Sequence, residues 1–138
     1  MRAPVKVCGI RSLKDAKIAF KYGASAIGLI FFKDSKRYIC PNLVAEWIGS
    51  LDPRVKKVGV FVDEEIDIVN SLSDKLGLDF IQLHGNESAA YCNLVKKPVI
   101  KAFRVHEKFN PSILDCYEVE AFLFDNYNIY KDLISKKK

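Results

Sequence analysis

Six residues with reactive or charged side chains lie at or just after short apolar segments of the chain: Cys8, Arg37, Asp63, His84, Arg104 and Asp125. A cysteine thiolate can serve as a general base, and a carboxyl group can serve as a general acid near neutral pH if its pKa is raised. Asp125 directly follows the apolar run Ala121–Phe124, so we expect burial to favour its protonated form. Arg37 lies beside Tyr38 in a polar loop, and its planar guanidinium suits a carboxylate ligand. These residue types predict an enzyme.

Each of these residues also has a purely structural explanation. An isolated cysteine at the end of a strand is commonly a small buried apolar residue, and Asp125 could cap a following helix. Gln82 and His84 are two residues apart and share one face of a strand, where either fits as an interior polar residue with hydrogen-bond partners. Lys101 and Arg104 place further cations near the end of another apolar segment. The residue types alone leave both explanations open.

A regular alternation of strand-like and helix-like segments positions these residues. Six apolar segments predict strands: Val5–Val7, Ala26–Phe32, Lys57–Val62, Phe80–Leu83, Val99–Phe103 and Ala121–Phe124. Apolar residues at helical spacing predict the intervening helices: 12–23, 43–51, 66–76, 87–95 and a stretch from Asn110 onward. Ser12 is a candidate N-cap, and Gly23 and Gly77 are stop signals. The strands recur about every 23 residues, which fits compact βα units.

Alternating strands and helices with buried parallel strands permit either an open doubly wound sheet or a barrel. The barrel is favoured because no Gly-x-Gly-x-x-Gly motif follows the first strand. The chemically capable residues are also spread over all the strand ends, and a barrel delivers such residues to the face where barrel enzymes have their active sites. We therefore predict an α/β fold of the TIM type. It is expected to be a single partial domain over residues 1–138, with about six of the eight strands of a complete barrel.

The composition excludes several classes of protein. The chain of 138 residues is 49% hydrophobic and 28% charged, an ordinary globular balance. Its net charge is +5, but Lys136–Lys138 contribute three of these charges, so the rest of the chain does not indicate a nucleic-acid partner. The longest apolar run, Ala26–Phe32, is too short for a membrane span, and the N-terminus lacks a secretory signal. The four cysteines are widely spaced, unlike those of metal sites. We expect a cytoplasmic protein without a metal, membrane or nucleic-acid partner.

Several segments, taken in order, resemble one enzyme family. They are Lys-Val-Cys-Gly-Ile-Arg at 6–11, Gly-Ala-Ser-Ala-Ile-Gly-Leu-Ile-Phe-Phe at 23–32, Ser-Lys-Arg-Tyr at 35–38, Val-Gly-Val-Phe-Val at 58–62, Gln-Leu-His-Gly at 82–85 and Ile-Lys-Ala-Phe-Arg-Val at 100–105. In this combination, from Lys6 to Asp125, they resemble phosphoribosylanthranilate isomerase of tryptophan biosynthesis. Indole-glycerol-phosphate synthase is a weaker match because it does not account for Cys8 and the 82–85 motif together.

The resemblance implies a (β/α)₈ barrel that performs an Amadori rearrangement of a small phosphorylated substrate, N-(5-phosphoribosyl)anthranilate, without a metal or cofactor. Asp125 is then the general acid that opens the ribose ring to a Schiff base, and Cys8 is the general base that removes the proton from the sugar C2. Arg37 would hold the anthranilate carboxylate, and His84 would form part of the pocket wall. The alternative is a catalytically inactive barrel remnant that acts as an assembly or binding module.

The resemblance also implies two further βα units, whose glycine-rich loops bind the substrate phosphate in the family. We expect the sequence to lack these units because it ends soon after its sixth strand. The outer edges of the first and sixth strands would then be open, and unpaired strand edges promote association. We therefore expect self-association, or association with a complementing fragment, at these edges.

Overall fold

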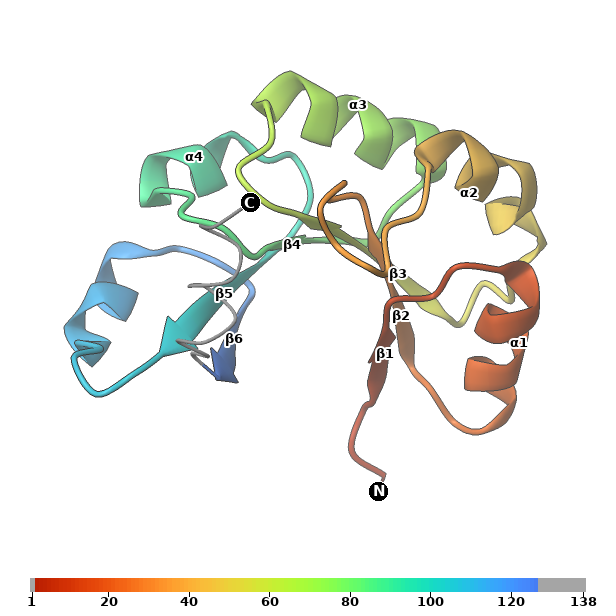
Figure 1. Cartoon of the computed structure of the whole chain (residues 1–138), viewed down its shortest axis with the longest axis horizontal. Helices are drawn as coiled ribbons and strands as arrows, with labels where there is room; N and C mark the ends of the chain where they lie inside the picture. The colour runs from red at the N-terminus through yellow and green to blue at the C-terminus, as the bar shows by residue number, and fades with distance from the viewer. Residues whose placement is uncertain (1, 127–138) are drawn as a thin grey trace.

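A computed structural model describes residues 2–126, which form one sheet of six parallel strands. The strands are β1 (Lys6–Cys8), β2 (Ala26–Ile30), β3 (Lys56–Phe61), β4 (Phe80–Leu83), β5 (Val99–Val105) and β6 (Ala121–Asn126). Their order in the sheet follows the sequence, and each strand is parallel to the next. Figure 1 shows the sheet curling, with helices in an arc along its outer side. A doubly wound sheet would reverse its strand order, so the prediction of a partial TIM-type barrel is confirmed.

Helices connect successive strands, and the first and fourth α-helices begin at serine caps. The elements are α1 (Leu13–Lys21), α2 (Pro41–Trp47), α3 (Ile66–Leu76) and α4 (Ala89–Leu94), with two 3₁₀ helices, η1 (Ile48–Ser50) and η2 (Pro111–Cys116). The Ser12 hydroxyl accepts a 3.1 Å hydrogen bond from the Asp15 N–H, and the Ser88 hydroxyl accepts one of 3.0 Å from the Tyr91 N–H. These side chains satisfy free N–H groups of the first helical turn. The caps therefore fix where the loops after β1 and β4 end.

The hydrophobic core lies largely between the sheet and its helices. The side chains of Ile27, Leu29, Ile81 and Leu83, on β2 and β4, are completely buried. Most residues of β2 and β3 are buried on both faces, as the continuous apolar runs of the sequence predict. This packing makes the sheet a rigid support for the side chains at its carboxyl edge.

Four elements differ from prediction in ways that bear on the site or on the connections between strands. Strand β5 continues to Val105 and β6 to Asn126, so Arg104 and Asp125 are paired strand residues and do not follow their strands. Backbone pairing continues past the apolar runs because main-chain hydrogen bonding does not depend on side-chain polarity. The helix predicted over 43–51 divides into α2 and η1, and the stretch from Asn110 forms only the short η2.

Aromatic side chains cover one face of β5 and β6. The ring centroid of Phe103 lies 5.2 Å from that of Tyr117, just after η2, and 6.0 Å from that of Phe122. The rings of Phe122 and Phe124 are stacked at 6.4 Å, so these alternate residues share a face. Within residues 2–126, β1 and β6 each pair with one neighbouring strand only.

Candidate active site

Cys8 and Arg37 meet at the carboxyl ends of β1 and β2. The Arg37 Nη1 atom donates a 3.0 Å hydrogen bond to the Cys8 carbonyl oxygen. Gly9 makes this approach possible because a Cβ atom at its position would lie 2.6 Å from Arg37 Cδ. Its φ of +88° lies in the region that favours glycine. The close neighbour of Gly9 is therefore the Arg37 side chain.

The Cys8 thiol lies against β2. Cys8 is in register with Gly28, and a Cβ atom at Gly28 would lie 2.7 Å from Cys8 Sγ. A larger residue at position 28 would displace the sulfur atom. The Cys8 side chain is partly exposed, whereas Cys92 is buried. Cys8 is therefore a thiol that a reactant can reach.

A second polar group joins β4 to β6. The Gln82 Nε2 atom lies 3.1 Å from His84 Nδ1, and His84 Nε2 lies 3.1 Å from Asp125 Oδ2. Gln82 is 2% exposed, whereas the side chains of His84 and Asp125 are 21% and 52% exposed. A buried amide is thus linked through an imidazole to a half-exposed carboxylate. Such an arrangement is suited to proton transfer at its exposed end.

The expectation that burial keeps Asp125 protonated is wrong. Burial does raise the pKa of its carboxyl group, but the hydrogen bond from His84, that from the Asn126 N–H and the charge of Arg104 lower it, so the net shift is downward. The Asn126 N–H donates to Asp125 Oδ1 over 2.8 Å. The Asp125 side chain is half-exposed even though the four residues before it are apolar. In the free protein Asp125 is therefore ionised at neutral pH.

The Cys8–Arg37 group and the Gln82–His84–Asp125 group lie at the same edge of the sheet. All six strands are parallel, so their carboxyl ends face one side. Within residues 2–126, no hydrogen bond or ion pair joins the two groups directly. The idea that Cys8, Arg37 and Asp125 share one substrate pocket therefore stays a prediction.

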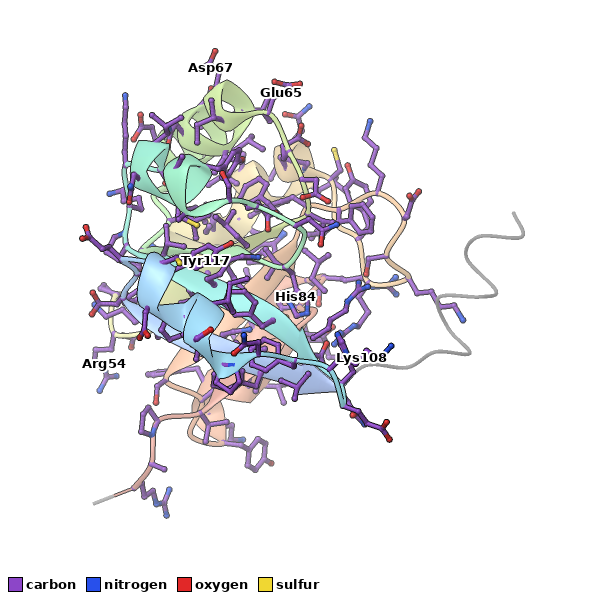
Figure 2. All side chains as sticks on the ribbon, turned by 90° about the vertical axis from the view of Figure 1, so that its left-hand side faces the viewer. Arg54, Glu65, Asp67, His84, Lys108 and Tyr117 are labelled. Atoms are coloured by element: carbon purple, nitrogen blue, oxygen red, sulfur yellow. The ribbon has the colours of Figure 1, made fainter. Side chains whose placement is uncertain are left out.

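A cavity of about 620 Å³ opens beside His84. Its wall is formed by the loops after β3 and β4, by β5 with the loop that follows it, and by η2. Figure 2 shows His84, Lys108 and Tyr117, three of the lining residues, near the β5 and β6 end of the molecule. Asp125 borders a further cavity of about 560 Å³, together with Phe109 and Phe124. His84 thus lies in a cavity wall.

A buried ion pair near this cavity was not foreseen from the sequence. The Lys101 Nζ atom lies 3.0 Å from Glu87 Oε1, and the two side chains are 2% and 1% exposed. Nζ also lies within hydrogen-bond distance of the carbonyl oxygens of Leu83, Gly85 and Ala102, at 3.4, 2.8 and 3.2 Å. Lys101 had been grouped with Arg104 as a cation near a strand end. It lies instead in the middle of β5, with its ammonium enclosed by oxygen atoms.

The Glu87 carboxylate connects the loops after β3 and β4. Its Oε2 accepts a hydrogen bond from the Asp63 N–H at 2.8 Å, and its Oε1 accepts one from the Gly85 N–H at 2.9 Å. Asp63, one of the six residues first singled out, accepts a 2.8 Å hydrogen bond from the Asn86 N–H. A lysine within an apolar strand signals that a buried partner is needed. The identity of that partner, 14 residues earlier in the chain, has no local signal.

Replacing Gly9 with alanine should destabilise the chain and displace Arg37. The positive φ and the 2.6 Å contact predict a loss of about 1–3 kcal/mol in the free energy of unfolding, measured by urea denaturation. Gly49→Ala is a matched control because its added Cβ atom would meet no atom within 4 Å apart from those of its own local backbone and chain neighbours. Equal, small losses in the two variants would contradict the strained geometry assigned to Gly9.

Three further properties concern the described part of the chain. Among residues 2–126, no group of three or more His, Cys, Asp and Glu side chains is placed to hold a metal ion. No helix in that range has the length and apolar character needed to cross a membrane. All four cysteines are free thiols.

Parallel βα units in sequential order, forming a curled sheet, place the chain in the class of TIM-type barrel proteins. A family model described as N-(5'-phosphoribosyl)anthranilate isomerase matches residues 5–130. The chain belongs to this isomerase family.

Individual relatives agree with this assignment. The chain is 50% identical over 124 residues to the N-(5'-phosphoribosyl)anthranilate isomerase of Geobacter sp. (strain M21), covering 90% of this chain and 61% of the relative. The corresponding protein of Citrifermentans bemidjiense is 49% identical over 124 residues, covering 90% of this chain and 60% of that relative. The chain therefore spans about 60% of the length of these curated relatives.

Solved structures show the same fold. A crystal structure of phosphoribosyl anthranilate isomerase from Thermus thermophilus has a TM-score of 0.85 at 32% identity, covering 99% of this chain and 74% of that chain. Another isomerase structure, in complex with reduced 1-(o-carboxyphenylamino)-1-deoxyribulose 5-phosphate, has a TM-score of 0.80 at 31% identity. The match covers 99% of this chain and 71% of that chain. The six strands thus correspond to part of a known barrel.

Proposed function

We propose that this chain carries the acid–base part of an isomerase that converts N-(5-phosphoribosyl)anthranilate into 1-(2-carboxyphenylamino)-1-deoxyribulose 5-phosphate in tryptophan biosynthesis. Family membership supports the reaction type, and a related structure binds a reduced form of this product. The observation that carries the proposal is the placement of the Cys8 thiol and the Asp125 carboxylate at the same edge of one curled sheet. The two groups approach that edge from different strands, as an acid and a base acting on opposite sides of a sugar require.

The proposed reaction begins at the ribose ring. Asp125, in its protonated form, donates a proton to the ring oxygen while the bond from that oxygen to C1 breaks, which gives an open-chain Schiff base. The Cys8 thiolate then removes the proton from C2, and the electron pair moves to form an enolamine. The enolamine loses its hydroxyl proton and gains one at C1 to give the ketone. The sequence needs one acid and one base and involves no net oxidation of the molecule.

Arg37 is proposed to bind the anthranilate carboxylate. Within the described residues, its Nη1 atom bonds to the Cys8 carbonyl oxygen, and its remaining guanidinium donors have no partner. These donors can form a paired hydrogen bond to a carboxylate. Because Nη1 is tied to Cys8, the same contact would place the substrate close to the thiol.

The strand edges support a second part of the proposal. Strands β1 and β6 each have one unpaired side within residues 2–126, and Phe124 on β6 is 55% exposed. Unpaired edges with apolar neighbours favour association with another strand. We propose that a further strand pairs with β1, with β6 or with both. This strand is supplied either by a complementing fragment or by a second copy of this chain.

Conversion of the substrate by the chain tests the proposed function. We expect product to form and Arg37→Met to raise KM by roughly 10- to 10²-fold, because a hydrogen bond between charged groups would be lost. Arg54→Met is the control, since Arg54 pairs with Asp52, away from the site, at 2.8 Å. Chromatographic separation of substrate and product gives the rate. A folded chain that neither converts the substrate nor binds the reduced product would overturn the proposal and favour an inactive binding module.

A further inference from the structure

The Gln82 amide is buried and has hydrogen-bonding capacity that is not used. Its Nε2 atom lies 3.1 Å from His84 Nδ1, while its Oε1 atom has no hydrogen-bond partner within residues 2–126. Gln82 is 2% exposed, and an amide carbonyl without a partner at such a depth is unfavourable. An unused acceptor therefore lies on the same amide that already contacts the imidazole.

The two orientations of this amide fit two protonation states of His84. With Nε2 toward the ring, the amide donates, so Nδ1 carries no proton and the ring proton is on Nε2, where it is donated to Asp125 Oδ2. A half turn of the amide places Oε1 against the ring. The amide then accepts, so Nδ1 must carry a proton. The carbonyl oxygen gains a partner only in this second orientation.

We propose that Gln82 is a positioning residue that selects which nitrogen of His84 is protonated, and thereby controls the loading of a proton onto Asp125. The inference rests on the proposed function, in which Asp125 is the general acid. It addresses a difficulty of that function, since the half-exposed carboxylate is ionised in the free protein and an acid must first acquire its proton. The neighbouring imidazole is the group from which Asp125 can receive it.

The proposed loading step conserves protons. The pair starts as an Asp125 carboxylate and a neutral His84 with its proton on Nε2. One proton is taken up from solvent. An Nδ1–H bond forms and the Gln82 amide turns to accept it, while the Nε2–H bond breaks and its proton passes to Asp125 Oδ2. The products are a neutral carboxyl group and a neutral imidazole. Transfer of the carboxyl proton to the substrate oxygen regenerates the Asp125 carboxylate, and uptake of a proton at Nε2 with loss of the Nδ1 proton then restores the starting tautomer of His84.

The charged groups around the pair come from β5 and from the loops after β3, β4 and β5. Arg104, in register with Asp125 on the neighbouring strand, lowers the pKa of the carboxyl group. The cavity beside His84 is also lined by Asp63, Glu87, Lys101, His106 and Lys108. These charges influence the pH at which the pair takes up a proton. Within residues 2–126, however, the hydrogen bond to His84 Nδ1 comes from Gln82, so the amide is the group that distinguishes the two tautomers.

Nitrogen-15 NMR of the full chain without substrate tests the inference. The chain has two histidines, so the variant His106→Asn leaves only the ring signals of His84. At high pH we expect a protonated Nε2 and an unprotonated Nδ1. As the pH falls, the side-chain amide signals of Gln82 should change with the same midpoint as the His84 ring. A protonated Nδ1 at high pH, or an amide that does not respond to the ring titration, would overturn the inference.

Two substitutions should move the His84 midpoint in opposite directions. Gln82→Glu supplies a permanent acceptor for Nδ1–H and should raise the midpoint by about one pH unit or more. Gln82→Met removes the acceptor and should lower it. Gln82→Met is the discriminating variant, because a carboxylate at position 82 raises the midpoint through its charge whatever the role of the native amide. Unchanged midpoints in both variants would contradict the proposal. The acid limb of the kcat/KM profile should shift with each midpoint. If the NMR shifts occur in a chain that has no isomerase activity, the proposed function fails and the role of Gln82 stands.

Discussion

Asp125→Asn should lower kcat for the isomerisation by about 10²-fold or more, because the variant keeps the shape of the side chain but cannot donate an acidic proton. The amide can still hydrogen-bond to His84, so the geometry of the pair should change little. The value of KM should change less than kcat, since the group acts mainly in the transition state. Steady-state kinetics on the full chain provide the measurement.

The matched control for this prediction is Asp67→Asn. Asp67 is exposed on α3 and lies away from His84 in Figure 2. Its loss should leave kcat unchanged. Cys8→Ser adds an independent comparison, because it replaces the proposed base and should also lower kcat. The roles assigned here are incorrect if both Asp125→Asn and Cys8→Ser turn over the substrate at the rate of the unmodified chain.

Lys101→Met should lower the free energy of unfolding by about 3–5 kcal/mol, because it leaves the Glu87 carboxylate buried without its cation. The N–H groups of Asp63 and Gly85 would still bond to that carboxylate, but they cannot neutralise its charge. Protonation of Glu87 at acid pH should relieve part of the loss. Urea denaturation at neutral and acid pH measures both effects.

A second substitution separates the charge effect from packing. Lys101→Met combined with Glu87→Gln removes both charges and should recover much of the lost stability, since replacement of a whole buried ion pair costs less than removal of one partner. Lys96→Met, on an exposed residue, is the surface control and should change stability by no more than about 0.5 kcal/mol. Equal losses in the single and double variants would show that the buried charge is not the cause.

The strand ends could be predicted from the sequence, but the environment of one key side chain could not. The apolar run before Asp125 correctly indicated a strand, yet it suggested that the carboxyl group is buried. Phe124 and Asp125 are consecutive strand residues and therefore point to opposite faces. The aromatic face surrounds Phe124, while Asp125 meets His84 on the other face. The aromatic members of the run, Phe122 and Phe124, thus lie on the opposite face of the sheet from the carboxyl group.

The contrast between Arg37 and Lys101 shows where sequence reasoning ends. Arg37 lies in a recognisable motif, and a glycine at position 9 leaves room for another side chain to approach the backbone. The observed contact between Arg37 and Gly9 therefore agrees with the residue types at both positions. The Lys101 ammonium on β5 binds the carboxylate of Glu87, which lies in a loop, and several backbone carbonyl oxygens. Such contacts depend on the three-dimensional course of two loops, for which the residue types give no spacing rule. The tautomer selected by Gln82 likewise depends on distances between atoms.

The sequential strand order has a consequence for how the chain acquires its structure. Within residues 2–126, each strand from β2 onward pairs with the strand that immediately precedes it in the sequence. No strand in that range must wait for a partner from a distant part of the chain, so the loops closed at each step are short and their entropic cost is modest. The sheet can therefore grow one βα unit at a time during synthesis on the ribosome, with β1 and β2 as its starting pair.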